Sequence, residues 1–166
     1  MFQLKPISHE SVSSALAKAE HYRLLAEPSE AESICRDVLA LEPENQHALV
    51  VLTLALTDLI PKDSKAFSRA VEAAATLQSP YERAYYAGII WERRAKAQHH
   101  SGQHGSRHHV YEWLVKALGL FDQAEQLRPA GNDDALLRWN TCVRFLARHR
   151  ELAPVSEEAP SAIMSE

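Results

Sequence analysis

The stretch CRDVLALEPENQH (residues 35–47) ends an amphipathic run at Leu-Glu-Pro and restarts a helical pattern a few residues later. A close counterpart, DQAEQLRPAGNDD (residues 122–134), shows the same order of features. Because Pro cannot continue a helix, each stretch separates two helices. We interpret both stretches as seams between stacked helical hairpins. This interpretation predicts a repeat scaffold that works by holding a partner.

The composition around these seams is that of one globular, helical domain. The chain has 166 residues, of which 46% are apolar and 24% charged, as is usual for proteins with a packed core. Glycines number only 5, and residues that favour helices outweigh alternating, strand-like patterns. We therefore predict an all-α fold.

Charge and hydropathy limit the partners and the compartment. The net charge of -4 and the pI near 6.1 give no overall reason to bind nucleic acid or an anionic membrane. The densest apolar run, residues 48–56, is roughly half of the ~20 residues that a spanning helix needs. Cys35 and Cys142 lie inside helical patterns, as buried thiols in a reducing compartment would. We expect a cytoplasmic protein without nucleic-acid or membrane partners.

Prolines and capping residues divide the chain into seven expected helices. Pro28 and Pro80 suit helix starts, Pro43 ends a helix, and Asn132 to Asp134 are good capping residues. The expected helices cover about residues 10–26, 28–42, 45–60, 63–78, 80–98, 107–128 and 133–149. A lead of residues 1–9 precedes them, and residues 151–166, rich in Pro, Ser and acid, are expected to form a flexible tail.

The helices repeat at a fixed period. Matching positions in the odd-numbered helices are Ala15, Leu49, Ala84 and Ala135, which lie 34, 35 and 51 residues apart. The last interval equals one period of 34 plus an insertion of 17 residues, at the His-rich stretch of residues 98–109. Self-similarity of this kind indicates a solenoid rather than a closed bundle.

The repeated residues resemble those of the tetratricopeptide repeat (TPR) family, which has a 34-residue period. Two features depart from the family pattern: Cys35 replaces an aromatic residue, and the second repeat matches only with a shift around Ala66 or Ala70. The matching residues are Ala19, Tyr22, Ala31, Leu39, Leu41 and Pro43 in the first repeat, and Gly88, Trp91, Ala117, Phe121, Ala124 and Pro129 in the third.

The resemblance implies three hairpins and a C-terminal capping helix within residues 10–150. Two helices approach to about 8–10 Å only where the side chains at the crossing are small, which explains Ala31, Gly88 and Ala117 independently of the family. The implied repeats cover about residues 12–45, 46–80 and 81–131, the last with the insertion, and the capping helix covers residues 132–149.

In TPR proteins the first helix of each hairpin lines a concave groove that binds peptides. The position-by-position match gives acidic or apolar residues where one TPR subclass grips a C-terminal carboxylate, so we expect an apolar peptide, a partner helix or a basic segment instead. The implied groove residues are Leu16, Glu20, Arg23, Val50, Leu54, Thr57, Asp58, Glu82, Tyr85, Tyr86, Ile89, Glu92 and Arg93. Tyr85 and Tyr86 fit a recognition surface, or alternatively pack against the insertion as core.

The insertion offers a second functional hypothesis. Neutral imidazoles bind zinc, copper or nickel, and His108 and Glu112 would share one helix face. A solvated loop and a pH-sensitive loop are the alternatives. The candidate ligands are His99, His100, His104, His108 and His109.

Enzymatic motifs are absent from the sequence. It contains no GxSxG, phosphate-binding loop, dinucleotide fingerprint, HExxH or CxxC pair. Cys142 has no identifiable His or acid partner for catalysis. We expect a non-enzymatic, cofactor-free adaptor that binds a protein or peptide, with metal binding or metal delivery as the alternative.

Overall fold

The structure, a computed structural model, describes residues 2–102 and 107–154. Within these ranges the chain forms α-helices and no strand, which confirms the predicted all-α fold. Short 3-10 turns, η1 (His9–Ser11) and η2 (Arg150–Leu152), precede and follow the helices. The seven helices are α1 (Val12–Leu24), α2 (Pro28–Leu41), α3 (Gln46–Leu59), α4 (Ala66–Ala75), α5 (Pro80–His100), α6 (Arg107–Leu127) and α7 (Asp134–Arg148).

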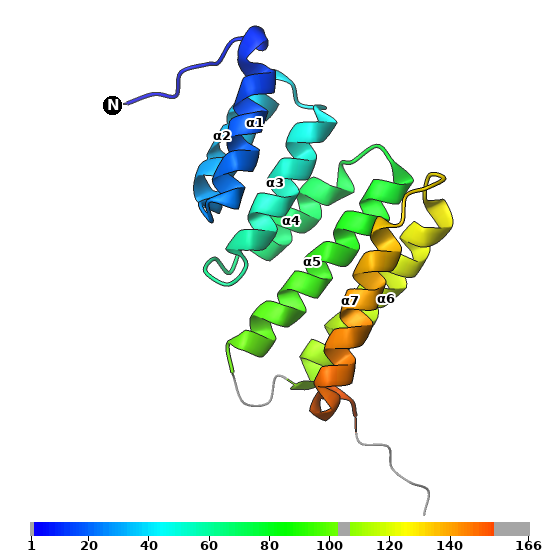
Figure 1. Cartoon of the computed structure of the whole chain (residues 1–166). Helices are drawn as coiled ribbons and strands as arrows, with labels where there is room; N and C mark the ends of the chain where they lie inside the picture. The colour runs from blue at the N-terminus through cyan, green and yellow to red at the C-terminus, as the bar shows by residue number, and fades with distance from the viewer. Residues whose placement is uncertain (1, 103–106, 155–166) are drawn as a thin grey trace, which may run out of the picture.

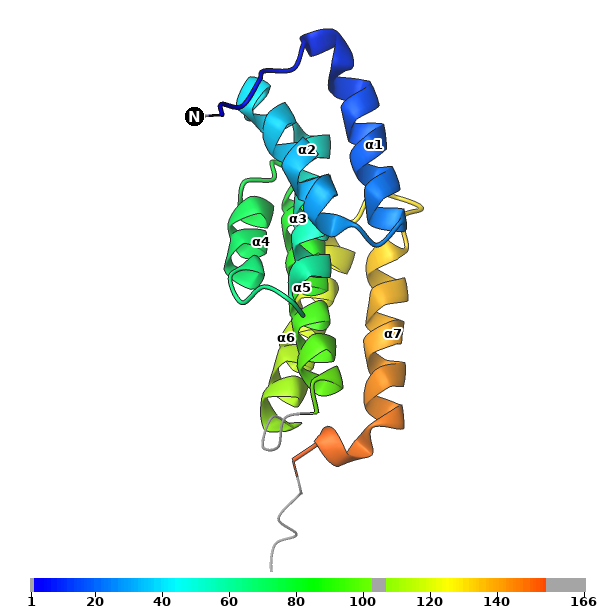
Figure 2. The ribbon, with the colours of Figure 1, turned by 90° about the vertical axis from the view of Figure 1, so that its left-hand side faces the viewer.

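The helices lie in two layers. One layer holds α1, α3, α5 and α7, and the other holds α2, α4 and α6 (Figures 1 and 2). Each helix packs on the next one in the chain, and α1 with α3, α3 with α5, and α5 with α7 also contact each other. The apolar helix α3 is buried on most of its surface, as expected for a helix between neighbours.

Local sequence signals set most helix boundaries. Asn45 precedes α3, and its Oδ1 accepts the Ala48 N–H at 2.9 Å. Ser79 caps α5 in the same way, while Pro28 and Pro80 occupy first turns. These side chains and rings satisfy or replace the N–H groups that a helix start leaves unpaired. The helix starts near residues 28, 45 and 80 were therefore predictable.

Both predicted boundaries of the fourth helix are wrong. The fourth helix was expected over residues 63–78, but α4 is shorter because Asp63 Oδ1 accepts the Lys65 N–H at 2.8 Å and holds a turn before it. The fifth and sixth helices were expected over residues 80–98 and 107–128, and α5 and α6 agree with these ranges to within two residues on either side of the His-rich stretch. Buried Ala95, Val110 and Leu114 continue the helical pattern on both sides of it.

Small residues lie buried in the first and third hairpins, as predicted. Ala31 in α2 and Ala117 in α6 are fully buried. In α5, a Cβ placed on Gly88 would lie 2.5 Å from the ring of Phe121 in α6. Glycine is therefore required where α5 and α6 cross.

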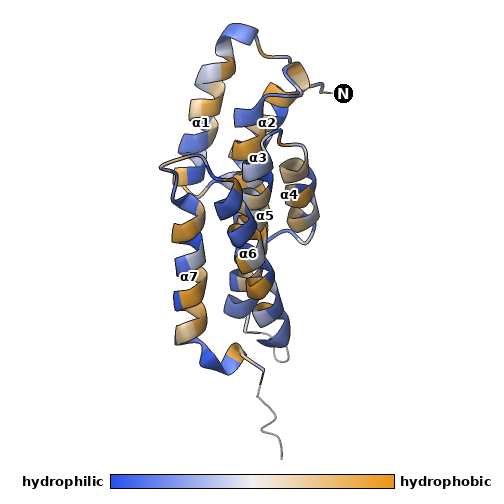
Figure 3. Cartoon of the chain, turned by 90° about the vertical axis from the view of Figure 1, so that its right-hand side faces the viewer, coloured by the Kyte–Doolittle hydropathy of each residue, from blue (hydrophilic) through white to orange (hydrophobic). Residues whose placement is uncertain are grey.

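The outer surface is mixed in hydropathy. The view in Figure 3 shows apolar as well as polar segments on α7, and Leu137 and Val143 of this helix are exposed. Helix α7 is thus less polar on its exposed face than its Asp, Arg and Asn content suggested. Among the described residues, no helix combines the length and the hydropathy that crossing a bilayer requires.

Candidate binding groove

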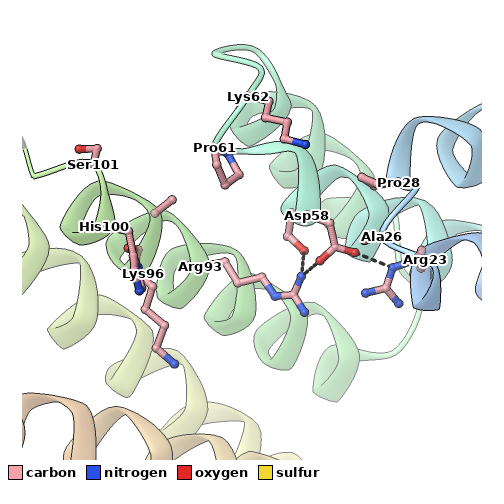
Figure 4. A pocket seen from close by; sticks show the side chains of 12 residues that line it. Arg23, Ala26, Pro28, Asp58, Pro61, Lys62, Arg93, Lys96, His100 and Ser101 are labelled. Atoms are coloured by element: carbon pink, nitrogen blue, oxygen red, sulfur yellow. Dashed lines mark hydrogen bonds and ion pairs between the residues drawn. The ribbon is translucent and has the colours of Figure 1, made fainter.

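A cavity of about 740 Å³ opens on the layer formed by the odd-numbered helices. It lies where the C-terminal parts of α1, α3 and α5 meet (Figure 4). Its volume is within the range of about 300–1,000 Å³ that is usual for ligand sites. The lining residues are Arg23, Ala26, Pro28, Thr57, Asp58, Pro61, Lys62, Arg93, Lys96, Ala97, His100 and Ser101.

A network of ion pairs joins the three helices at this cavity. Arg23 Nε of α1 donates to Asp58 Oδ2 of α3 at 2.9 Å. Arg93 of α5 donates to the other oxygen of Asp58 and to Thr57 Oγ1, the latter at 3.0 Å. Figure 4 shows Asp58 between the two guanidinium groups. One carboxylate thus orients two arginines.

The lining carries more positive than negative charge. Burial lowers the pKa of Arg93 to about 10, with further contributions from Arg23 and Arg138. Burial also lowers the pKa of Arg23, yet both arginines remain charged near neutral pH. Lys96 is paired with Glu92, so Arg23, Arg93 and Lys62 are the three cations that face a single lining carboxylate, Asp58.

Helix ends do not cancel this surplus. The C-terminal ends of α1, α3 and α5 and the N-terminal end of α2 lie at the cavity. Each end is equivalent to about half an elementary charge, so together they contribute about one negative charge. The three cations that Glu92 does not neutralise exceed that charge and Asp58 combined by about one positive charge. The cavity therefore attracts anions, although the whole chain has a net charge of -4.

The structure brings four of the thirteen predicted groove residues into the cavity, namely Arg23, Thr57, Asp58 and Arg93. Leu16 and Ile89 are core residues with 3% and 1% of their surface exposed, so their assignment to the groove surface is wrong. Burial of these two side chains by neighbouring helices was not visible in the sequence. Glu20, Val50, Leu54, Glu82, Tyr85 and Tyr86 lie outside the cavity lining.

Glu92 is also wrongly placed in the predicted groove. Only 1% of its surface is exposed. Lys96 Nζ lies 2.5 Å from its Oε1, and Arg138 Nη1 of α7 lies 3.6 Å from its Oε2. Burial of a carboxylate is tolerated because it is paired with cations. Glu92 therefore joins α5 to α7 instead of meeting a ligand.

The expectation of a basic partner segment loses its basis in these pairs. It depended on Glu20, Asp58, Glu82 and Glu92 as free acids. Asp58 is shared by two arginines, and Glu92 is buried with its own cations. Glu20 Oε1 lies 2.7 Å from His47 Nε2, which is charged only when protonated, and Glu82 has no ion pair among the described residues, so two of the four acids are neutralised. Carboxylates that are already paired offer little attraction to a basic peptide.

The Tyr pair belongs to an aromatic cluster away from the cavity. Tyr85 and Tyr86 are half-buried with ring centroids 5.2 Å apart, and Tyr85 stacks on Tyr81 at 5.7 Å. Phe121 of α6 lies 6.2 Å from Tyr85. Burial, followed by the charge of Glu82, raises the pKa of Tyr86 to about 12. The rings pack on one another rather than on the insertion.

The predicted histidine cluster is divided between two helix ends. The His99 ring at the end of α5 meets the ring of His149, which directly follows α7, edge to face with centroids 4.4 Å apart, whereas His108 and His109 lie in the first turn of α6. His108 lies 3.1 Å from Glu112, as expected for residues one turn apart. His104 lies outside the described residues, and among those described, no group of three or more His, Cys, Asp or Glu could hold a metal. Metal binding stays a prediction.

Sequence reasoning missed Lys62, Lys96 and His100 of the cavity. A signal for two of them existed, because Arg93, Lys96 and His100 follow the i, i+3, i+7 spacing of one helix face.

Comparisons of the chain with family models, curated proteins and solved structures found no match.

Proposed function

We propose that the chain is a TPR-like scaffold that binds an acidic segment of a partner protein at the cavity between α1, α3 and α5. The alternating layers, the contacts between successive odd-numbered helices, and the buried Ala31 and Ala117 support a solenoid of three hairpins and a capping helix. The observation that carries the partner's chemistry is the surplus of cations in the lining.

The ion-pair network prepares the arginines for a carboxylate ligand. Asp58 lies between Arg23 and Arg93 and accepts hydrogen bonds from both. Arg23 donates through Nε and Arg93 through Nη1, so both guanidiniums keep other N–H groups for a ligand. Arginine presents five N–H donors in a planar fork, which suits bidentate carboxylate recognition. Because the side chains are already held, less rotamer entropy is lost on binding than for free arginines.

The lysines extend the positive surface along the groove. Lys62 belongs to the loop after α3, and Lys96 lies one turn beyond Arg93 on α5. Lys96 shares its charge with Glu92, so Lys62 and the two arginines supply most of the attraction. An extended segment with spaced Asp or Glu residues matches this arrangement better than a single carboxylate.

The proposal is tested with two fluorescently labelled peptides of equal length, one alternating Glu and Leu and the other alternating Lys and Leu. We expect fluorescence anisotropy to show saturable binding of the acidic peptide, weakened about tenfold or more by Arg93→Gln or Arg23→Gln. Arg128→Gln is the matched control, because Arg128 pairs with Asp133 far along the chain from the cavity residues.

Two outcomes separate the partner's charge from the scaffold role. Tighter binding of the basic peptide would overturn the acidic partner and leave a peptide-binding groove. Binding of either peptide with equal affinity by the Arg93→Gln, Arg23→Gln and unmodified chains would show that the cavity is not the binding surface.

A further inference from the structure

Arg94 differs from the other half-buried arginines of the described chain. Those arginines each have a carboxylate within ion-pair distance: Arg23, Arg69, Arg93, Arg128 and Arg138. Arg94 has neither an ion pair nor a hydrogen bond to any described residue. A half-buried guanidinium with no acceptor among the described residues can still donate to solvent or to a ligand.

Aromatic rings hold the Arg94 guanidinium in one place. Its Cζ lies 3.9 Å from the ring centroid of Phe67 in α4 and 4.1 Å from that of Trp113 in α6. Trp91 lies beside them, with its ring centroid 5.0 Å from that of Phe67. Rings this close to a guanidinium attract it through cation–π contacts and leave N–H groups at its edges available.

A small cavity lies against this group. Its volume is about 320 Å³, and its lining includes Pro61, Ser64, Phe67, Arg94, Ser101 and Trp113. Asp63 also lines it, but its carboxylate binds Arg69 and the Lys65 N–H. This volume is at the low end of the range of about 300–1,000 Å³ for ligand sites, which suits a small molecule rather than a chain segment.

We propose that Arg94 anchors a second ligand site, which binds the carboxylate or phosphate group of a small molecule in the cavity between α4, α5 and α6. The in-plane N–H groups of Arg94 donate to two oxygens of the anion. Ser64 lines the same cavity, and its hydroxyl supplies a further donor, whereas the Ser101 hydroxyl already donates to the Gln98 carbonyl oxygen at 2.8 Å. The aromatic rings fix the orientation of the fork before the ligand arrives.

This site uses a different arginine from the groove of the proposed function, although Pro61, Ala97 and Ser101 line both cavities. Arg93 and Arg94 are adjacent in α5, yet Arg93 lines the larger cavity and Arg94 the smaller one. Each residue is therefore the matched control for the other. Anion binding at Arg94 does not depend on whether the groove binds an acidic peptide.

The test titrates the chain with sodium phosphate, sodium acetate or sodium chloride at constant ionic strength. Trp fluorescence and the Nε–Hε resonance of Arg94 are followed. We expect a saturable change in both signals with phosphate or acetate, and the anion that saturates at lower concentration identifies the ligand group. Arg94→Gln is expected to weaken this binding about tenfold or more, and Arg93→Gln to leave it unchanged.

A response that is equal for chloride, or that persists in Arg94→Gln, would overturn the site. If Arg94→Gln loses helicity, the resonance of Arg94 in the unmodified chain decides the question. An Nε–Hε signal that does not move with phosphate or acetate would show that Arg94 only links α4 to α6.

Discussion

The hairpin of α1 and α2 and the hairpin of α5 and α6 each bury an alanine at the same repeat position but fill the next turn differently. The alanines are Ala31 and Ala117, and four residues later stand Cys35 and Phe121, all buried. At the position where α1 has Ala19, α5 has Gly88, whose missing Cβ makes room for the Phe121 ring. The volume that one side chain adds is thus removed from its neighbour on the facing helix.

The same two hairpins also differ in length, and the difference bears on function. The first has helices of 13 and 14 residues, and the third has two helices of 21 residues. By the repeat register, the end of α1 at Leu24 corresponds to Arg93 in α5. Lys96, Ala97, His100 and the Arg94 fork therefore lie on or beside the extra length of α5. Both candidate cavities are walled by this extension.

The largest expected effect is on the rate at which the two cysteine thiols, one in each half of the chain, react with a labelling reagent. Burial raises the pKa of Cys35 and of Cys142 to about 12 from 9.0, which leaves about a thousandfold less thiolate at pH values below 9. We expect both folded thiols to resist a thiol-labelling reagent that reacts rapidly with the unfolded chain. Cys142 should react faster than Cys35, because α7 lies at the end of the array whereas α2 packs between α1 and α3.

Single-cysteine chains, Cys35→Ala and Cys142→Ala, allow each rate to be measured separately. Reaction of either thiol in the folded chain at the rate of the unfolded chain would contradict the burial described for that half.

The second expected effect is on the free energy of unfolding, when Phe121 or Cys35, the residues four positions after the buried alanines, is replaced by alanine. Phe121→Ala should lower the free energy of unfolding by about 3–5 kcal/mol, because it leaves a large cavity under Gly88. Cys35→Ala removes one heavy atom and should cost about 1 kcal/mol. Denaturant unfolding monitored by circular dichroism measures both. Similar losses of unfolding free energy for the two variants would show that Phe121 does not fill more of its hairpin's core than Cys35 fills of the other.

The third effect isolates the close approach of α5 and α6. Gly88→Ala should destabilise the chain by about 1–3 kcal/mol, since the new Cβ meets the Phe121 ring. Gly119→Ala is the matched control, because a Cβ there meets nothing within 4 Å, and it should stabilise by about 0.5–1 kcal/mol. Adding Phe121→Leu to Gly88→Ala should recover part of the loss, and strictly additive losses would contradict the contact.

The smallest effect concerns the seams with which the two hairpins end. Before Pro43 stands Glu42, whose pKa is lowered below its ordinary 4.5 by hydrogen bonds from Asn45 and then His9. Before Pro129 stands Arg128, which binds Asp133. A lowered carboxyl pKa stabilises the fold above the ordinary pKa, and this contribution is lost as pH falls through the folded-state pKa.

We therefore expect Glu42→Gln to lower the melting temperature slightly near neutral pH and to leave it unchanged in strong acid. A Glu42→Gln effect that is the same at both pH values would assign it to packing rather than to charge.

The sequence predicted the parts of the fold that depend on local chemistry. Pro28, Asn45 and Pro80 mark helix starts that act within one turn, so no knowledge of neighbouring helices was needed. The ends of α5 and α6 beside the His-rich stretch were predicted to within two residues, because the apolar spacing that includes Ala95 and Val110 continues both helices up to it.

The candidate site was less predictable, because its charge depends on pairs between distant residues. Asp58 counted as a free acid in the sequence, but Arg23 and Arg93, each 35 residues away, neutralise it. Glu92 likewise pairs with Arg138 across a helix interface. Periodicity assigns a residue to a helix face, but not the partner that meets it there.

The acidic-partner proposal is tested most directly by mapping where a peptide binds. The Glu-Leu peptide is titrated into the isotope-labelled chain, and backbone amide resonances are followed by NMR. The account predicts saturable shifts grouped in residues 23–28, 57–62 and 93–101, the segments that line the cavity. Shifts confined to α2 and α6, or shifts that the Lys-Leu peptide reproduces at the same concentrations, would contradict it.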